Sequence, residues 1–243
     1  MQNQYDPRTT SRIDPAISVG VPSATRDAGL RSYMLKVYNY MASGVLLTGI
    51  VALLFANSGM AAQVMATPLK WLIILAPLGF VFAMSFGVNR MSTATLQTLF
   101  WGFAVAMGLS MSTIFLVYTG TSIAQTFFAV SAAFLGLSLY GYTTKKDLSG
   151  FGTFLIMGVV GLLVAMVINI FLQSTAMAFA ISAIGVLLFA GLTVYDTQKI
   201  KSMYAHIAGT DMMGKAAIMS ALTLYLDFIN MFQFLLMFMG DRR

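Results

Sequence analysis

The chain has 243 residues, of which 58% are hydrophobic and only 9% are charged, whereas soluble domains carry roughly 25% charged residues. A water-soluble globular fold is therefore excluded, and the absence of cysteine together with a single histidine leaves few groups for catalysis or metal binding. The net charge of +6 does not indicate nucleic-acid binding, because the basic residues lie between apolar runs and form no polar face.

Two regions follow from the distribution of apolar residues along the chain. Residues 1–28 are polar and proline-containing, and we expect a disordered tail. Residues 29–243 form the membrane domain, in which seven runs reach the length of about 20 residues needed to cross a bilayer. Backbone groups in lipid must be bonded internally, so we predict an all-α polytopic fold. The seven predicted transmembrane helices are Tyr33–Ala56, Trp71–Asn89, Ala94–Tyr118, Ser122–Tyr142, Gly152–Leu172, Ala176–Tyr195 and Ala216–Met239.

The basic residues predict the orientation. A cytoplasmic N-terminus places eleven of the 14 on the inner side, against Lys70, Arg242 and Arg243 on the outer side. We therefore expect an inner (cell) membrane protein with its N-terminus in the cytoplasm. The terminal arginine pair leaves two alternatives for the last run, which either crosses the membrane or bends back. Crossing is favoured because the 24 residues of that run suffice to span.

Small residues in the third run indicate close helix packing. Ala104, Gly108 and Ser112 are spaced four apart, which lets the backbone of another helix approach. The same spacing arises by chance in sequences rich in glycine and alanine, so it is not evidence for a dimer.

Asp227 is the most unusual residue, because charged groups at membrane depth are costly and default candidates for function. It lies 12 residues after Lys215, roughly 18 Å into the last helix at 1.5 Å per residue. Ser220, Thr223 and Asn230 share its helix face. A polar stripe must face protein or water, so we expect the last helix to be surrounded by the others. The alternative is a neutral buried acid bonded to one neighbouring helix.

Asp196 and Arg90 end the sixth and second runs, at similar depth near the inner boundary. Each residue has an alternative interpretation. Asp196 could be an interfacial residue in contact with the hydrated lipid headgroups, and Arg90 could be a topology marker whose side chain snorkels to the interface. If the two aspartates approach each other, one proton would be shared between them. Arg90 would instead favour the ionised form of an aspartate. A switch between a protonated Asp–Asp pair and an Arg–Asp pair would therefore act as a proton-controlled latch between the helices.

The chain resembles the Bax inhibitor-1 family in its bacterial branch. The matching stretches are Ala221–Asn230 (ALTLYLDFIN), Val194–Gln198 (VYDTQ) and Gly108–Tyr118 (GLSMSTIFLVY). The resemblance implies six helices wrapped around a central C-terminal helix. It also implies a pH-sensitive Ca²⁺ leak gated by an aspartate pair, here Asp196 and Asp227, with Arg90 as the closing arginine. Some bacterial relatives are associated with a membrane-bound AAA protease.

The favoured function is therefore a pH-sensitive calcium (cation) leak channel. The expected ion path offers two carboxyl groups, those of Asp196 and Asp227, and a set of neutral polar residues that we expect to line the pore: Thr193, Thr197, Ser220, Thr223 and Asn230. These oxygens are too few for a tight Ca²⁺ site. Transient binding suits passage, which requires release of the ion. Expected partners are the lipid bilayer, Ca²⁺ and protons; no cofactor is expected.

Two other functions compete with the channel. An intramembrane aspartyl protease would also place aspartates on the sixth and seventh helices, but Tyr225 and Leu226 replace the glycines that loosen the backbone there, so no enzyme is expected. A regulatory protein without transport, bound to the membrane protease or another membrane complex, could dock through the tail or the polar Gln198–Lys215 loop. His206 lies in that predicted loop, so no Ser–His pair or histidine-rich metal site can form at membrane depth.

Overall fold

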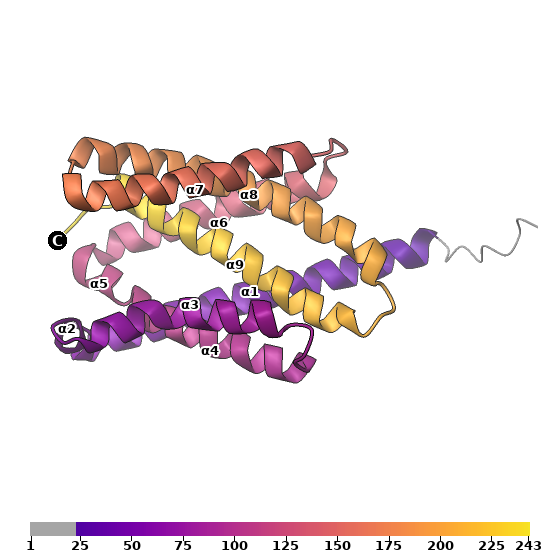
Figure 1. Cartoon of the computed structure of the whole chain (residues 1–243), viewed down its shortest axis with the longest axis horizontal. Coiled ribbons are helices and arrows are strands. Elements are labelled where there is room, and N and C mark those ends of the chain that lie inside the picture. The colour runs from indigo at the N-terminus through magenta and orange to yellow at the C-terminus, as the bar shows by residue number, and fades with distance from the viewer. Residues whose placement is uncertain (1–22) are drawn as a thin grey trace, which may run out of the picture.

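The structure is a computed structural model that describes the backbone of residues 23–243 and side chains from Asp27 onward. Within this part, the chain is a bundle of helices (Figure 1) without a strand, apart from one isolated bridge between Tyr118 and Arg242. The helices are α1 (Ser23–Asn57), α2 (Met60–Met65), α3 (Leu69–Gly87), α4 (Thr93–Met111), α5 (Thr113–Val117), α6 (Gly120–Thr143), α7 (Ser149–Leu172), α8 (Thr175–Ile207) and α9 (Met212–Met239).

Seven of these segments are long and apolar enough to cross a membrane, which confirms the predicted all-α polytopic fold. Helices α4 and α5 together form the third span, Thr93–Val117, with a break at Ser112. The hydroxyl of Ser112 donates to the carbonyl of Leu109 at 2.7 Å, a local bond that competes with helix continuation at this position. Helix α2 is a short segment between the first two spans.

Helix α9 lies at the centre of the bundle, between a layer that contains α1, α3 and α4 and a layer that contains α6, α7 and α8 (Figure 1). It packs against α8, α1, α6 and α4. Helix α3 packs mainly on α4 and α7 mainly on α8, so these two form the outer edges. The predicted central position of the last helix is therefore confirmed, and the helix buries a larger share of its residues than any other span.

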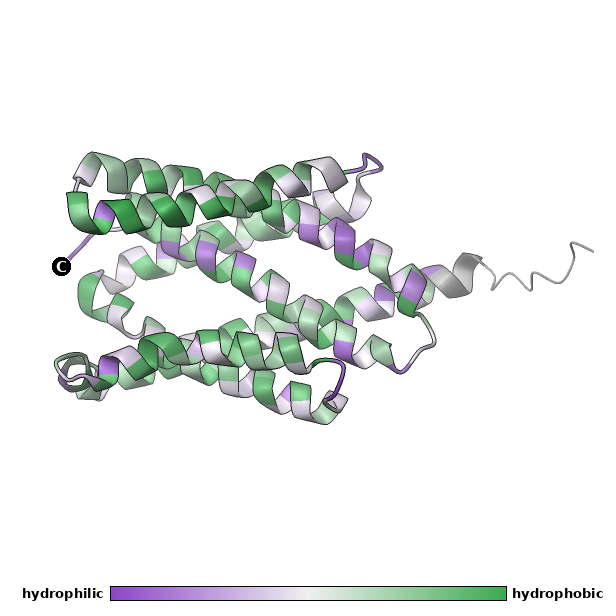
Figure 2. Ribbon diagram, viewed as in Figure 1, coloured by the Kyte–Doolittle hydropathy of each residue, from purple (hydrophilic) through white to green (hydrophobic). Residues whose placement is uncertain are grey.

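The outward faces are apolar (Figure 2), as expected for helices that contact lipid. Phe86 on α3 and Phe171 on α7 are 82% and 83% exposed, and Leu187 on α8 is exposed as well. A large apolar surface of this kind would aggregate in water, so the chain is a multi-pass membrane protein.

The helices at the N-terminal end of the bundle are longer than predicted. Helix α8 continues to Ile207, so the expected polar loop Gln198–Lys215 was wrong and most of it is helix, including exposed His206. The extension packs on the start of α1, where the rings of Tyr33 and Tyr204 lie 5.4 Å apart. The predicted run ends at Tyr195, but the helix continues to Ile207, and Gly209, two residues beyond its end, adopts the left-handed φ of 77°.

The predicted tail falls mostly outside the described residues, which begin at position 23. Its last six residues, 23–28, already belong to α1. The boundary at residue 28 therefore marks the change in composition and not the start of the helix.

The C-terminus lies at the opposite end of the bundle from the start of α1 (Figure 1). The backbone N–H of Arg243 donates to Val117 at 2.9 Å, and that of Thr119 donates to Asp241 at 3.0 Å. The guanidinium of Arg242 lies 5.9 Å from the centre of the Tyr118 ring. The last helix therefore crosses the whole bundle, as favoured, and does not bend back.

The small-residue ridge of α4 packs within the chain against α1. The Thr48 hydroxyl donates to the carbonyl of Ala104 at 2.8 Å, and a side chain at Gly108 would collide with Thr48 and Val51. The close approach predicted from the spacing is confirmed between α4 and α1 of the same chain.

Candidate functional site

Asp196 and Asp227 come from α8 and α9, the two helices with the most extensive mutual contact. Both are buried, with exposed fractions of 9% and 4%. A side-chain hydrogen bond joins the two carboxyl groups. The structure thus brings the two sequence-predicted acids together at the centre of the bundle.

The contact between these carboxyl groups requires a proton. A carboxylate only accepts hydrogen bonds, so two of them can be joined only when one carries the donor hydrogen. The Oδ2 atom of Asp227 is buried and accepts no bond from any conventional donor in the part of the chain that the structure describes. A hydrogen bond between the two carboxyl groups thus needs one proton, which would belong to the pair and not to either residue.

Arg90 does not reach the aspartates. It is exposed in the turn between α3 and α4, and this turn is fixed beside the start of α9 by a hydrogen bond from Lys215 to the carbonyl of Val88 at 3.2 Å. Asp227 lies 12 residues further along α9, roughly 18 Å away at 1.5 Å per residue. The predicted Arg–Asp contact is therefore absent from this conformation of residues 27–243.

Lys199 supplies the positive charge that acts on Asp196. It lies one turn further along α8, with its ammonium 5.9 Å from the centre of the Tyr195 ring. In the sequence, Lys199 was counted only among the basic residues that predict the orientation. The i, i+3 spacing from Asp196 was the signal that could have identified it.

The predicted pore-lining residues are already hydrogen-bonded. Thr193, Thr223 and Asn230 each donate to the backbone carbonyl four residues earlier in their own helices. Thr197 donates to Ser138 of α6 at 3.4 Å, and Ser220 bonds the Tyr33 hydroxyl of α1 at 3.2 Å. Ser138 and Tyr33 were missed because a lone polar residue in an apolar run gives no indication of its partner.

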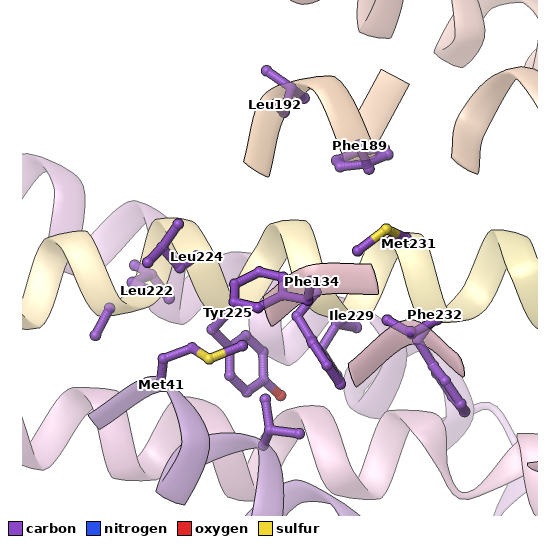
Figure 3. Close-up of a cluster of buried hydrophobic side chains, with 14 of the residues drawn as sticks. Met41, Phe134, Phe189, Leu192, Leu222, Leu224, Tyr225, Ile229, Met231 and Phe232 are labelled. Carbon is purple, nitrogen blue, oxygen red and sulfur yellow. The ribbon is translucent and has the colours of Figure 1, made fainter. Parts of the chain in front are cut away.

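Apolar side chains from α1, α6, α8 and α9 enclose the middle of α9 (Figure 3). Phe134, Phe189 and Met231 are among the labelled residues of this cluster, and Phe134 contacts Phe228, the neighbour of Asp227, with ring centres 5.6 Å apart. Five cavities open between the helices, and none of the five is lined by Asp196 or Asp227. The middle of α9, which carries Asp227, is therefore enclosed by apolar side chains.

The site offers few ligands for a resident metal. Within the described residues, no group of three or more histidine, cysteine, aspartate or glutamate side chains lies close enough to hold an ion. Two carboxylates fall short of the six to eight oxygens that Ca²⁺ prefers. Transient Ca²⁺ contact with Asp196 and Asp227 stays a prediction.

Fold and site together define a class: a seven-span helical membrane protein whose central helix carries a buried, hydrogen-bonded aspartate pair. Residues 30–243 match the family model described as inhibitor of apoptosis-promoting Bax1. The chain is 50% identical to an uncharacterized protein of Rickettsia prowazekii, with 90% of this chain and 93% of the relative covered. It is 45% identical to the inner membrane protein YbhL of Escherichia coli K12, over 89% and 94% of the two chains. The chain belongs to the Bax inhibitor-1 family.

Proposed function

We propose that the protein is a pH-sensitive cation leak channel through which Ca²⁺ passes, gated by Asp196 and Asp227. The observation that carries this proposal is the buried hydrogen bond between the two carboxyl groups, which links the two most closely packed helices. A bond whose strength depends on the number of protons on the pair makes helix contact depend on pH. The homology to an inner membrane protein supports a location in the cell membrane, and the distribution of basic residues supports a cytoplasmic N-terminus.

The direction of the response follows from bond strength. With one shared proton, the pair forms a charge-assisted O–H···O⁻ bond, which is roughly twice as strong as a bond between neutral groups. Acid adds a second proton and leaves two neutral carboxyl groups with a weaker bond. The contact between α8 and α9 then loosens, so acid increases the leak.

Separation of these helices would open a space beside the oxygens needed along the path, which are bonded within their own helices or to α1 and α6 and not between α8 and α9. Neutral oxygens near the two acids come from both helices: Thr193 and Thr197 of α8, and Ser220, Thr223 and Asn230 of α9. Such a set binds Ca²⁺ weakly, and weak binding allows the ion to leave and conduction to continue.

Ion flux through the purified full-length protein in liposomes tests the proposal. We expect Ca²⁺ efflux to rise as the pH falls from 8 to 6, and we expect Asp227→Asn to remove this pH dependence. Asp211→Asn is the matched control, because Asp211 is exposed at the start of α9. The proposal fails if the parent protein passes no Ca²⁺ at any pH, or if the pH profile of Asp227→Asn matches that of the parent.

A second function is favoured by the helical extension of α8 beyond the bundle. Ser202, Ala205 and His206 are exposed on it, which offers a rigid surface to a membrane-bound AAA protease or another membrane complex. In that case the protein regulates its partner and transports nothing. Stable co-purification of such a complex, lost when these three residues are changed, together with absence of flux, would favour this alternative. In either case we propose that the chain is not an enzyme.

A further inference from the structure

A cavity of about 700 Å³ opens on one side of α1, near the N-terminal end of the bundle. Its volume lies within the usual range of roughly 300–1,000 Å³ for ligand sites. The lining combines two cations, polar side chains and two aromatic rings, and contains no carboxylate: Ala28, Arg31, Ser32, Leu35, Lys36, Asn39, Tyr40, Ser43 and Trp101. None of these residues belongs to the aspartate site.

The lining follows from the way α1 and α4 pack. Most of its residues recur every three or four positions along α1, so they share one face of that helix. Trp101 of α4 closes the side, with its ring centre 6.3 Å from that of Tyr40. Because Arg31 and Lys36 are both exposed, their charged ends are available at the mouth of the cavity.

The depth of the cavity places it at the boundary between hydrocarbon and headgroups. Helix α1 has 35 residues, whereas about 20 residues cross the hydrocarbon layer. Counted back from Asn57, those residues end near Tyr38. Lys36 and Arg31 therefore lie in the headgroup layer, whereas Tyr40 and Ser43 lie just inside the hydrocarbon. Tyr40 and Trp101 fit this position, because tyrosine and tryptophan are enriched at membrane interfaces.

We propose that this cavity binds the headgroup of an anionic phospholipid, with Arg31 and Lys36 on the phosphate. Basic pockets between helices on the cytoplasmic side are the usual form of such sites, and a guanidinium can donate two parallel bonds to phosphate oxygens. Asn39 and Ser32 can contact the polar part of the headgroup, while the acyl chains lie along Leu35 and Tyr40. Lipid binding here is independent of any flux through the aspartate pair.

The chain offers a direct optical test, because it has only two tryptophans. Trp71 lies on α3, outside the cavity, so Trp71→Phe leaves Trp101 as the only tryptophan reporter. The protein is reconstituted in phosphatidylcholine vesicles that contain a minor fraction of brominated lipid, either phosphatidylglycerol or phosphatidylcholine. Bromine quenches tryptophan fluorescence on contact, so the difference between the two lipids measures selectivity for the anionic headgroup.

We expect brominated phosphatidylglycerol to quench Trp101 more strongly, with a local enrichment of up to roughly thirtyfold at low salt for two attracting charges. Arg31→Gln combined with Lys36→Gln should remove this excess. The variant that exchanges the two cations, Arg31→Lys with Lys36→Arg, should retain the excess quenching. It controls for any effect of substitution at these two positions other than loss of charge.

The matched control is Lys145→Gln with Lys146→Gln, which removes the same charge from exposed residues outside the cavity. This control should keep the full excess. Equal quenching by the two brominated lipids in the parent would overturn the proposal. So would an excess that survives loss of Arg31 and Lys36, or one that the control variant loses to the same extent.

Discussion

At the scale of single residues, the sequence identified the unusual groups but not all of their partners. Asp227 could be found because an acid in the middle of an apolar run is costly, and its stripe of polar neighbours indicated a central helix. Its contact with Asp196 depended on the tilt and register of two helices, which no local pattern determines. Arg90 lies away from the pair in this structure, because similar depth in two helices does not place their ends side by side. Its exchange with the acid pair stays a prediction. Lys199 took its place as the cation near Asp196.

Tyr225 and Thr48 form a second buried polar contact that the sequence did not indicate. The Thr48 hydroxyl accepts from Tyr225 at 2.7 Å while donating to Ala104 at 2.8 Å. Tyr225→Phe removes one bond and leaves Thr48 paired, so we expect a loss of about 0.5–1.5 kcal/mol in unfolding free energy. Thr48→Val leaves the buried phenol without a partner and should cost more, about 1–3 kcal/mol.

Chemical unfolding of the two variants in the same detergent measures this order. In the Tyr225→Phe background, Thr48→Val should cost less than it does alone, because no phenol is then left unpaired. Equal losses for both single variants, with simple additivity in the double variant, would contradict the assigned hydrogen bonds.

At the scale of helices, hydropathy predicted the existence and order of all seven spans. It failed at the ends of α1 and α8, where the helix continues beyond the apolar run. Hydropathy indicates which residues are buried in lipid, but it does not indicate where the backbone leaves the helical conformation. The extension of α8 also fixes the loop between α6 and α7. Gln198 accepts from the backbone of Leu148 at 3.0 Å and donates to the carbonyl of Lys146 at 2.7 Å. In that loop, hydrogen bonds from Ser149 hold the pKa of the exposed Asp147 carboxyl below its usual value.

Two glycines of α6 test the packing of α6 on α8. A side chain at Gly141 would collide with the carbonyl of Val194 and approach Thr197, close to Asp196, whereas Gly136 faces open space. We expect Gly141→Ala to destabilise the protein by about 1–3 kcal/mol through overpacking. Gly136→Ala should be neutral or stabilising, because alanine is the better helix former by about 1 kcal/mol.

Thermal unfolding in detergent compares the two variants directly. The same substitution in the same helix controls for backbone propensity, so the difference reports packing alone. A Gly141→Ala protein as stable as Gly136→Ala would show that α6 and α8 are not in close contact at this position.

At the scale of the whole molecule, the fold places the two ends of the described chain at opposite ends of the bundle (Figure 1). This arrangement follows from an odd number of complete crossings, which the composition already favoured. The side of the membrane on which each end lies is predicted from the basic residues alone.

Single cysteines test that orientation without background, because the natural chain has none. Lys145 is exposed in the loop before α7, and Thr121 is exposed at the opposite end of the bundle, near the C-terminus. In intact cells, a membrane-impermeant maleimide should label Thr121→Cys and should label Lys145→Cys only after permeabilisation. The reverse pattern would place the N-terminus outside.

The central claim is that Asp196 and Asp227 share one proton inside the bundle. Infrared spectroscopy distinguishes a protonated carboxyl group from a carboxylate, and with eight aspartates and no glutamate the chain gives a simple spectrum. For the reconstituted protein at neutral pH, we predict one protonated carboxyl group, which is lost in Asp227→Asn and kept in Asp211→Asn. A parent spectrum in which all eight side-chain carboxyl groups are ionised, or a protonated band that Asp227→Asn leaves unchanged, would contradict the shared proton.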